Sequence, residues 1–230
     1  MKRFYKNAAV GEADDGFHIV LDGKVLKTPA RANLVVPSVA LAEAIAGEWG
    51  SAAETIDPQT MPLTRLAFAA IDSVAHHRDK IVHAVTSFGH SDLLCYRAEA
   101  PQELIARQAA AWDSMLDWAA ERYGAHLTVT FGISHAAQPE NALAALERAV
   151  QTHDDFALAA LHTAASITGS LVLALALSDS RLNAGVAFAI ATIDESFQAE
   201  KWGRDAEADA RLARLLSELA AAEHFLRLLA

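Results

Sequence analysis

The sequence predicts an α+β protein in which a small β-rich N-terminal domain, residues 1–58, precedes a larger all-α domain, residues 59–230. Two observations favour this fold class. Short extended segments, separated by turn residues, occupy roughly the first 36 positions, and an alanine-rich character with helical periodicity begins at Ser38 and continues to the C-terminus. Strands followed by a long run of helices are typical of an α+β arrangement.

The N-terminal strands are expected on both sides of Asp22-Gly23. Residues 17–20 and 24–26 are apolar or β-branched, and a two-residue Asp-Gly turn is a strong hairpin signal because glycine accepts a positive φ. Residues 4–5 and 33–36 are two further short candidates. Pro29 and Pro37 separate these segments from the helical part of the chain, since a residue before proline avoids the helical region.

The first helices are predicted from their caps. Ser38 is expected to be the N-cap of a helix to about residue 49. Thr60 is expected to cap a helix that carries Pro62 in its first turn and extends to about residue 88, because proline lacks only an N–H that has no partner there. The helix after Pro101 ends at Gly124, and its apolar stripe includes Gln108 and Trp112.

The second half of the chain is expected to be helical except at residues 127–131, which are β-branched and short. The predicted helices cover residues 139–152, 154–177, 183–203 and 205–229. Thr168-Gly169-Ser170 is placed inside the second of these, where small residues permit close helix packing.

Composition and charge exclude several classes of protein. The 230 residues are 53% hydrophobic and 21% charged, which is typical of a globular chain, and the net charge of −10 opposes nonspecific binding to nucleic acid or anionic lipid. The charge is uneven: residues 1–31 hold six basic and four acidic side chains, whereas the rest hold 13 and 25. The apolar run at residues 171–177 is too short to span a membrane, so no membrane insertion is expected.

No catalytic, metal or cofactor motif is found. His76, His83 and His90 repeat every seven residues. On one helix, successive members of this series are two turns, or about 10 Å, apart, which is too far for their side chains to converge on one metal ion. A solvated face is therefore expected rather than a metal site. Phosphate-binding glycine loops and nucleophile motifs are absent. Cys95 is the single cysteine, so the chain has no intrachain disulfide, and this residue is expected to be buried and apolar in character. His162 is expected to be a structural histidine. The sequence therefore predicts no enzyme, no metal and no cofactor.

Residues 193–203 (IDESFQAEKWG) combine acids and aromatics on one predicted helix. Glu195, Gln198 and Trp202 share a face, because offsets of three, four and seven return to the same side. Glu200 and Lys201 are expected to pair with Arg204 and Asp205, four positions later. Asp194 and Glu195 have no such basic neighbour, so they are either simply solvated or part of a recognition surface.

Short motifs along nearly the whole chain match one family. They are RFYK at residues 3–6, LDGKVLKTP at 21–29, EW at 48–49, TMPLT at 60–64, AID at 70–72, SDLLCYR at 91–97, QAAAWD at 108–113, GSLVLALAL at 169–177 and DESFQAEKWG at 194–203. In these motifs, their order and their spacing the chain resembles the assembly chaperones that bind the alpha subunit of the F1 sector of ATP synthase, known from mitochondria and alpha-proteobacteria.

The resemblance implies a two-domain molecular chaperone without ATPase activity that holds the unassembled alpha subunit until beta subunits replace it. We expect a monomer whose partner is that subunit. The start at RFYK favours a bacterial, alpha-proteobacterial cytoplasmic protein, or a processed form in the mitochondrial matrix. Glu195, with Asp194 and Gln198, is the hypothetical client contact, and Trp202 and Trp49 are expected to shape the surface.

Two alternatives stay open at this point. A helical small-molecule-binding or regulatory protein would use the same apolar helices to line a pocket. A weak hydrolase would combine Glu195 with a carboxylate from another helix.

Overall fold

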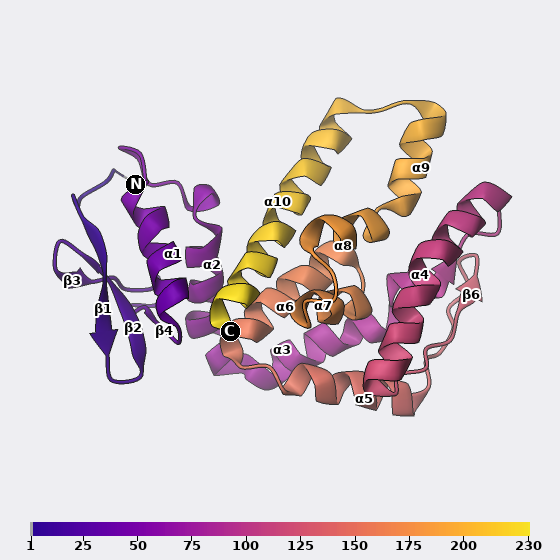
Figure 1. Ribbon diagram of the computed structural model, residues 1–230, viewed down its shortest axis with the longest axis horizontal. Coiled ribbons are helices and arrows are strands. Elements are labelled where there is room, and N and C mark those ends of the chain that lie inside the picture. Colours follow the sequence, from indigo (N-terminus) through magenta and orange to yellow (C-terminus); the bar gives the residue numbers. More distant parts are fainter. Residues whose placement is uncertain (1) are drawn as a thin grey trace. The chain divides into compact units, whose positions relative to one another are not determined.

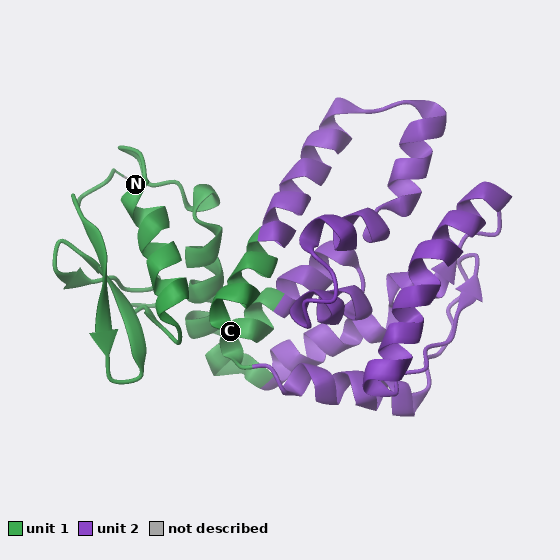
Figure 2. Cartoon of the chain, in the orientation of Figure 1, with its two compact units in different colours: residues 1–78, 154–160, 221–230 green, residues 79–153, 161–220 purple. Residues whose placement is uncertain are grey.

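The computed structural model describes residues 2–230 and has a small N-terminal sheet region followed by a mostly helical domain, as predicted (Figure 1). The chain divides into two compact units, shown in Figure 2. Unit 1 extends to residue 78 and also contains residues 154–160 and 221–230, and unit 2 comprises residues 79–153 and 161–220. This division differs from a single boundary after residue 58.

Unit 1 holds the sheet and the first helices. Its elements before residue 78 are β1 (Ala8–Ala13), β2 (Gly16–Leu21), β3 (Lys24–Val25), β4 (Val35–Val36), α1 (Val39–Gly50), the 3₁₀-helix η1 (Pro58–Thr60), α2 (Pro62–Ala69), the π-helical turn η2 (Ala70–Val74) and the start of α3 (Ala75–Ser87). Parts of α6 (Asp155–Thr168) and α10 (Ala206–Leu229) complete it.

The sheet is built around β2, which pairs antiparallel with β1, β3 and β4 (Figure 1). The predicted Asp22-Gly23 hairpin is confirmed: Leu21 pairs with Lys24, and the two turn residues have φ values of 48° and 80°. Strand β1 was not predicted, because its sequence AAVGEA lacks a β-branched or aromatic run. Residues 4–5 do not form a strand, although both were expected to be extended.

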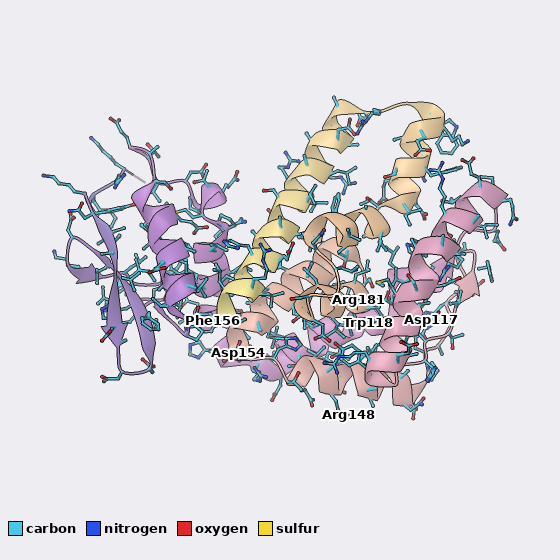
Figure 3. The ribbon with its side chains drawn as sticks, in the orientation of Figure 1. Asp117, Trp118, Arg148, Asp154, Phe156 and Arg181 are labelled. Carbon is cyan, nitrogen blue, oxygen red and sulfur yellow. The ribbon has the colours of Figure 1, made fainter. Side chains whose placement is uncertain are left out.

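One hydrophobic core explains why unit 1 continues past residue 58. Leu63 and Ala67 of α2 are buried in the same cluster as Leu41 of α1, and α1 packs against β1 and β2. Phe156 of α6, labelled in Figure 3, stacks on Phe225 of α10 with ring centroids 6.4 Å apart. The apolar face of α2 and two later segments therefore belong to this core.

Unit 2 is mainly helical. Its further elements are the 3₁₀-helices η3 (Phe88–Ser91) and η4 (Leu93–Cys95), β5 (Tyr96–Arg97), α4 (Gln102–Tyr123), β6 (Thr130–Phe131), α5 (Glu140–Gln151), α7 (Leu171–Ser178), α8 (Ala184–Ala191) and α9 (Ile193–Trp202). Strand β6 pairs in parallel with β5, so the extended segment expected at residues 127–131 is present but shorter.

Several helix boundaries match the predicted caps. The Ser38 hydroxyl accepts a hydrogen bond of 3.1 Å from the Leu41 N–H at the start of α1, and Gly124 ends α4 in the left-handed region. Thr60 is not the cap of α2: it lies in η1, where its hydroxyl donates to the Asp57 carbonyl, and Met61 precedes Pro62.

Three long predicted helices are divided. The helix expected after Pro62 contains a π-helical turn and a kink at His77, where φ is −136°. The segment 154–177 breaks at Gly169, which has a φ of 65°, so Thr168-Gly169-Ser170 joins α6 and α7 instead of lying inside one helix. The segment 183–203 breaks at Thr192 between α8 and α9. Across residues 2–230, no helix combines the length and apolar character needed to cross a bilayer.

Candidate functional site

The predicted site lies on α9, a short helix that begins with its acids. Asp194 and Glu195 occupy the first turn, where a negative charge is favourable beside the free N–H groups of the helix. Phe197 is the buried residue of the helix, and it turns one face of α9 inward. Glu195, Gln198 and Trp202 are exposed, as their shared helical face requires.

Asp194 is held within unit 2 by one of its oxygens. Its Oδ1 accepts a hydrogen bond of 2.7 Å from Nε2 of Gln108 on α4, and Oε1 of Gln108 accepts one of 2.8 Å from the N–H of Ala98. Gln108 is buried, so its amide needs both partners. Asp194 therefore positions α9 against α4. Of the two acids, Glu195 is the one that faces solvent.

Two ion pairs to α4 fix the other end of α9, and they replace the pairs expected along the helix. Glu200 pairs with Arg107 at 2.8 Å, and Lys201 pairs with Glu103 at 2.8 Å. The hydrogen bond from Lys201 holds the pKa of the Glu103 carboxyl below its usual value. Each cation also lies over the Phe197 ring, at 5.2 Å for Arg107 and 5.1 Å for Lys201.

The expected Glu200–Arg204 and Lys201–Asp205 pairs are wrong because α9 ends at Trp202. Gly203 has a φ of 94° and takes the chain out of the helix, so residues four apart no longer share a face. Arg204 instead pairs with Asp209 at 3.1 Å. The Asp205 carboxylate accepts a hydrogen bond of 3.0 Å from the Ala208 N–H at the start of α10.

Glu195, Gln198 and Trp202 together form what we call the α9 face. The Trp202 side chain is 79% exposed. Tryptophan has one of the largest apolar surfaces of any side chain, so this exposure leaves a large apolar contact open to solvent. Within residues 2–230, the Glu195 carboxylate has no ion pair and no hydrogen-bond partner. An open acid, an amide and an exposed indole at offsets of three and four make a surface suited to recognition.

Trp49 lies in unit 1 and is only 6% exposed. Its Nε1 donates a hydrogen bond of 3.1 Å to Oγ1 of Thr64, and its carbonyl oxygen accepts one of 2.7 Å from the Tyr5 hydroxyl. Trp49 is therefore part of the unit 1 core. Four of the five predicted site residues share α9, and the fifth does not lie on that helix.

The α4 partners of α9 were missed, although one signal pointed to them. Gln108 falls within the apolar stripe of α4, and a polar residue at a buried position needs a hydrogen-bond partner. Arg107 and Glu103 offered no such signal, because charged residues on a helix are ordinarily solvated.

Among the described residues, the histidines and the cysteine considered for metal binding or nucleophilic chemistry do not form such a site. Residues 2–230 contain no group of three His, Cys, Asp or Glu side chains placed to hold a metal ion, and His76, His83 and His90 are exposed. Cys95 is buried as expected, and burial raises the pKa of its thiol to about 12. The Cys95 thiol is therefore protonated at neutral pH and unsuited to act as a nucleophile. His162 is half-buried, and burial lowers its pKa.

Comparison with known proteins gives one consistent result. A family model described as ATP12 chaperone protein matches residues 2–120. The chain is 25% identical over 215 residues to the mitochondrial protein atp12 of Schizosaccharomyces pombe, and this match covers 88% of the chain and 74% of that protein.

Two solved structures resemble the whole fold. They are Atp12 from Paracoccus denitrificans and a point mutant of the same protein. Each superimposes with a TM-score of 0.96 at 41% sequence identity, and each match covers 100% of this chain and 98% of the solved one.

Proposed function

Because this chain belongs to the ATP12 chaperone family, we propose that it assists assembly of the F1 sector of ATP synthase by binding the unassembled alpha subunit. Bound in this way, the alpha subunit is kept from aggregating until beta subunits replace the chaperone. An isolated subunit of a hexamer exposes an apolar interface, and such a surface associates nonspecifically unless it is covered.

The α9 face is the observation that carries this proposal. Trp202 provides a large apolar contact that is open to solvent, and the Glu195 carboxylate beside it has no partner within the described residues. Interfaces typically depend on a few aromatic anchors with charged groups that select the partner. Asp194, Arg107 and Lys201 hold α9 against α4, so the face is presented on a fixed helix.

Charge supports a basic client surface. Residues 32–230 carry 25 acidic and 13 basic side chains, and a partner of opposite charge is attracted at long range. A chaperone must also leave when the final partner arrives, so a modest affinity serves better than a very tight one.

The proposal extends to the setting of this chaperone. We propose a monomer without enzymatic activity or cofactor, located in the cytoplasm of a bacterium, or in the mitochondrial matrix if the chain is a processed form. The partner is the alpha subunit, and neither nucleic acid nor a membrane is part of its action.

Co-expression with an isolated F1 alpha subunit tests the proposal. We expect the subunit to stay in the soluble fraction and to co-elute with the chaperone during size-exclusion chromatography. An alpha subunit that precipitates equally with and without this protein, and that never co-elutes with it, contradicts the proposal.

A further inference from the structure

Unit 1 contains an apolar groove of about 880 Å³, and none of the residues of the α9 face lines it. Apolar side chains from separate parts of unit 1 line it, and they include Leu26, Trp49, Ile56, Met61 and Phe68. All but Phe68 are buried in the unit 1 core, so the walls are fixed by packing. The groove is therefore formed by residues of the packed core of unit 1.

Three of the polar side chains that line the groove, those of Tyr5, Trp49 and Thr64, already have hydrogen-bond partners. The Tyr5 hydroxyl donates to the Trp49 carbonyl at 2.7 Å, and Nε1 of Trp49 donates to Oγ1 of Thr64 at 3.1 Å. The Thr64 hydroxyl in turn donates to Oε2 of Glu48 at 2.6 Å. Sites for small molecules normally orient their ligand with a few convergent polar groups. These walls offer apolar contact and shape instead, which favours a bulky apolar side chain as the occupant.

Phe4 stands at the groove and is 65% exposed. Its ring meets the Tyr5 ring edge-on, with centroids 5.4 Å apart, so Phe4 extends the apolar wall into solvent. Aromatic side chains are enriched at protein interfaces, where covering them releases water. An exposed phenylalanine beside an apolar groove is a contact suited to a polypeptide partner.

The rim of the groove is basic, in contrast to the acidic chain as a whole. Lys24, Lys27 and Arg65 line the groove and are exposed. Within residues 2–230, neither lysine has an ion-pair partner. The acid among the lining residues, Asp22, is engaged locally: its carboxylate accepts hydrogen bonds from the N–H groups of Lys6 and Asn7. A carboxylate on the occupant would therefore meet a positive rim.

We propose that this groove binds a segment of the client polypeptide in which a bulky apolar side chain lies beside one or more acidic residues. The apolar side chain enters the groove against Phe4, and the acidic residues face Lys24 and Lys27. This inference rests on the proposed chaperone function and adds to it a second client contact, on unit 1 and of opposite charge to the α9 face.

The charge of the rim is tested with the double variant Lys24→Glu/Lys27→Glu in the full chain. Its matched control is Lys80→Glu/Arg148→Glu, which changes the charge equally at exposed positions of α3 and α5 (Figure 3 labels Arg148). We expect the Kd for the F1 alpha subunit to rise about tenfold or more in the rim variant, because the carboxylates then meet like charges, and less than about twofold in the control. An unchanged Kd in the rim variant overturns the proposal.

The apolar contact is tested by replacing Phe4 with the photoreactive residue p-benzoylphenylalanine and irradiating the complex with the alpha subunit. We expect crosslinks confined to one client segment that contains a bulky apolar residue next to Asp or Glu. Crosslinks scattered over unrelated segments, or no crosslink from a complex that does form, overturn the proposal. So does native mass spectrometry that finds a small molecule bound to the purified protein and lost from Phe4→Ala.

The chaperone function and the client groove fail in different ways. If the wild-type protein forms no complex with the alpha subunit, the proposed function is wrong and the client groove is wrong with it. If the wild-type complex forms and Glu195→Lys weakens it while the rim variant does not, the proposed function holds and only the groove proposal fails.

Discussion

At the scale of one residue, Asp92 accepts hydrogen bonds from the first turns of two helices of unit 2, η4 and α7. Its side chain is fully buried; Oδ1 accepts a hydrogen bond of 3.1 Å from the Leu94 N–H in η4, and Oδ2 accepts one of 3.0 Å from the Val172 N–H in α7. Burial raises the pKa of this carboxyl to about 6, despite hydrogen bonds that favour the ionised form. At neutral pH the protein therefore contains a buried carboxylate.

This residue makes stability depend on pH in a defined direction. Because the pKa is raised on folding, the contribution of Asp92 to the free energy of unfolding is fully present below about pH 4 and declines as the pH rises through about 6. By linkage, the decline amounts to at most about 3 kcal/mol. The free energy of unfolding of the wild type minus that of Asp92→Asn, measured by urea unfolding from pH 4 to 7, should show this decline.

The control for Asp92 is Asp117→Asn, which changes an exposed carboxyl on α4 (Figure 3). Its curve of unfolding free energy against pH should run parallel to that of the wild type. If the curve of Asp92→Asn is parallel as well, Asp92 does not titrate in this range and the account of its burial is wrong.

Glu195 is the residue on which the client contact is predicted to depend. Since the side chain is exposed and unpaired within the described residues, Glu195→Lys should lose only the favourable charge in the first turn of α9 and shift the Tm by less than about 4 °C. Protection of the alpha subunit should nevertheless be lost, because the charge on the α9 face is reversed. Thermal unfolding and light scattering of the client are the two measurements.

A matched variant on α4 separates the site from general charge. Glu121→Lys reverses an exposed acid that lies fourteen positions after Arg107, about 21 Å along the helix axis. This variant should protect the client like the wild type. A Glu195→Lys protein that unfolds would mean that Glu195 is structural, and the α9 face would no longer explain binding.

At the scale of the element, Glu48 explains how α2 begins without a cap of its own. Oε1 of Glu48 accepts a hydrogen bond of 2.8 Å from the Leu63 N–H, and Oε2 accepts one of 2.8 Å from the Thr64 N–H. These are free donors in the first turn of α2, which has no side-chain cap from Met61. A residue near the end of α1 thus serves as the anion at the start of the next helix.

Removing this carboxylate should weaken unit 1. Glu48→Ala leaves two N–H groups and the Thr64 hydroxyl without their acceptor, and we expect the free energy of unfolding to fall by about 2 kcal/mol. Glu43→Ala, at an exposed position of the same helix, should change it by less than about 0.5 kcal/mol. Equal effects of the two variants in chemical denaturation would contradict the capping role.

Elements with local chemical signals were predictable from the sequence. The Asp22-Gly23 turn, the Ser38 cap and the Gly124 terminus each depend on residues within a few positions, and each is confirmed. Strand β1 carries no such signal, because its sequence lacks a run of β-branched or aromatic residues. It is a strand because it pairs with β2 along its whole length. The break at Gly169 was hidden because apolar residues continue on both sides of it, and the break at Thr192 has no adjacent proline or glycine to mark it.

For the candidate site, the sequence indicated the exposed face of α9 but not what holds it in place. The positions of Glu195, Gln198 and Trp202 follow from helical geometry alone. Their support comes from Gln108 and Arg107, which lie about 90 residues earlier in the chain and pair with Asp194 and Glu200. Contacts between distant segments depend on the tertiary fold, so spacing within one helix cannot predict them.

At the scale of the whole molecule, charge is expected to govern the rate at which the client is found. The net charge of −10 attracts a basic partner from a distance, and salt screens such attraction over about 8 Å at physiological ionic strength. Raising the salt from about 0.05 M to about 0.5 M should slow association with the alpha subunit on the order of tenfold, with a smaller effect on dissociation. Surface plasmon resonance over a salt series measures both rates, and a salt-independent association rate would contradict steering.

The central claim is that this protein holds the alpha subunit and gives it up to beta subunits. The most direct measurement is size-exclusion chromatography with light scattering on the purified complex with the alpha subunit, titrated with F1 beta subunit. We predict that the chaperone moves from the complex to the volume of the free monomer as an alpha–beta assembly forms. A chaperone that stays bound in a ternary complex at excess beta subunit, or that forms no complex before beta is added, would contradict the account.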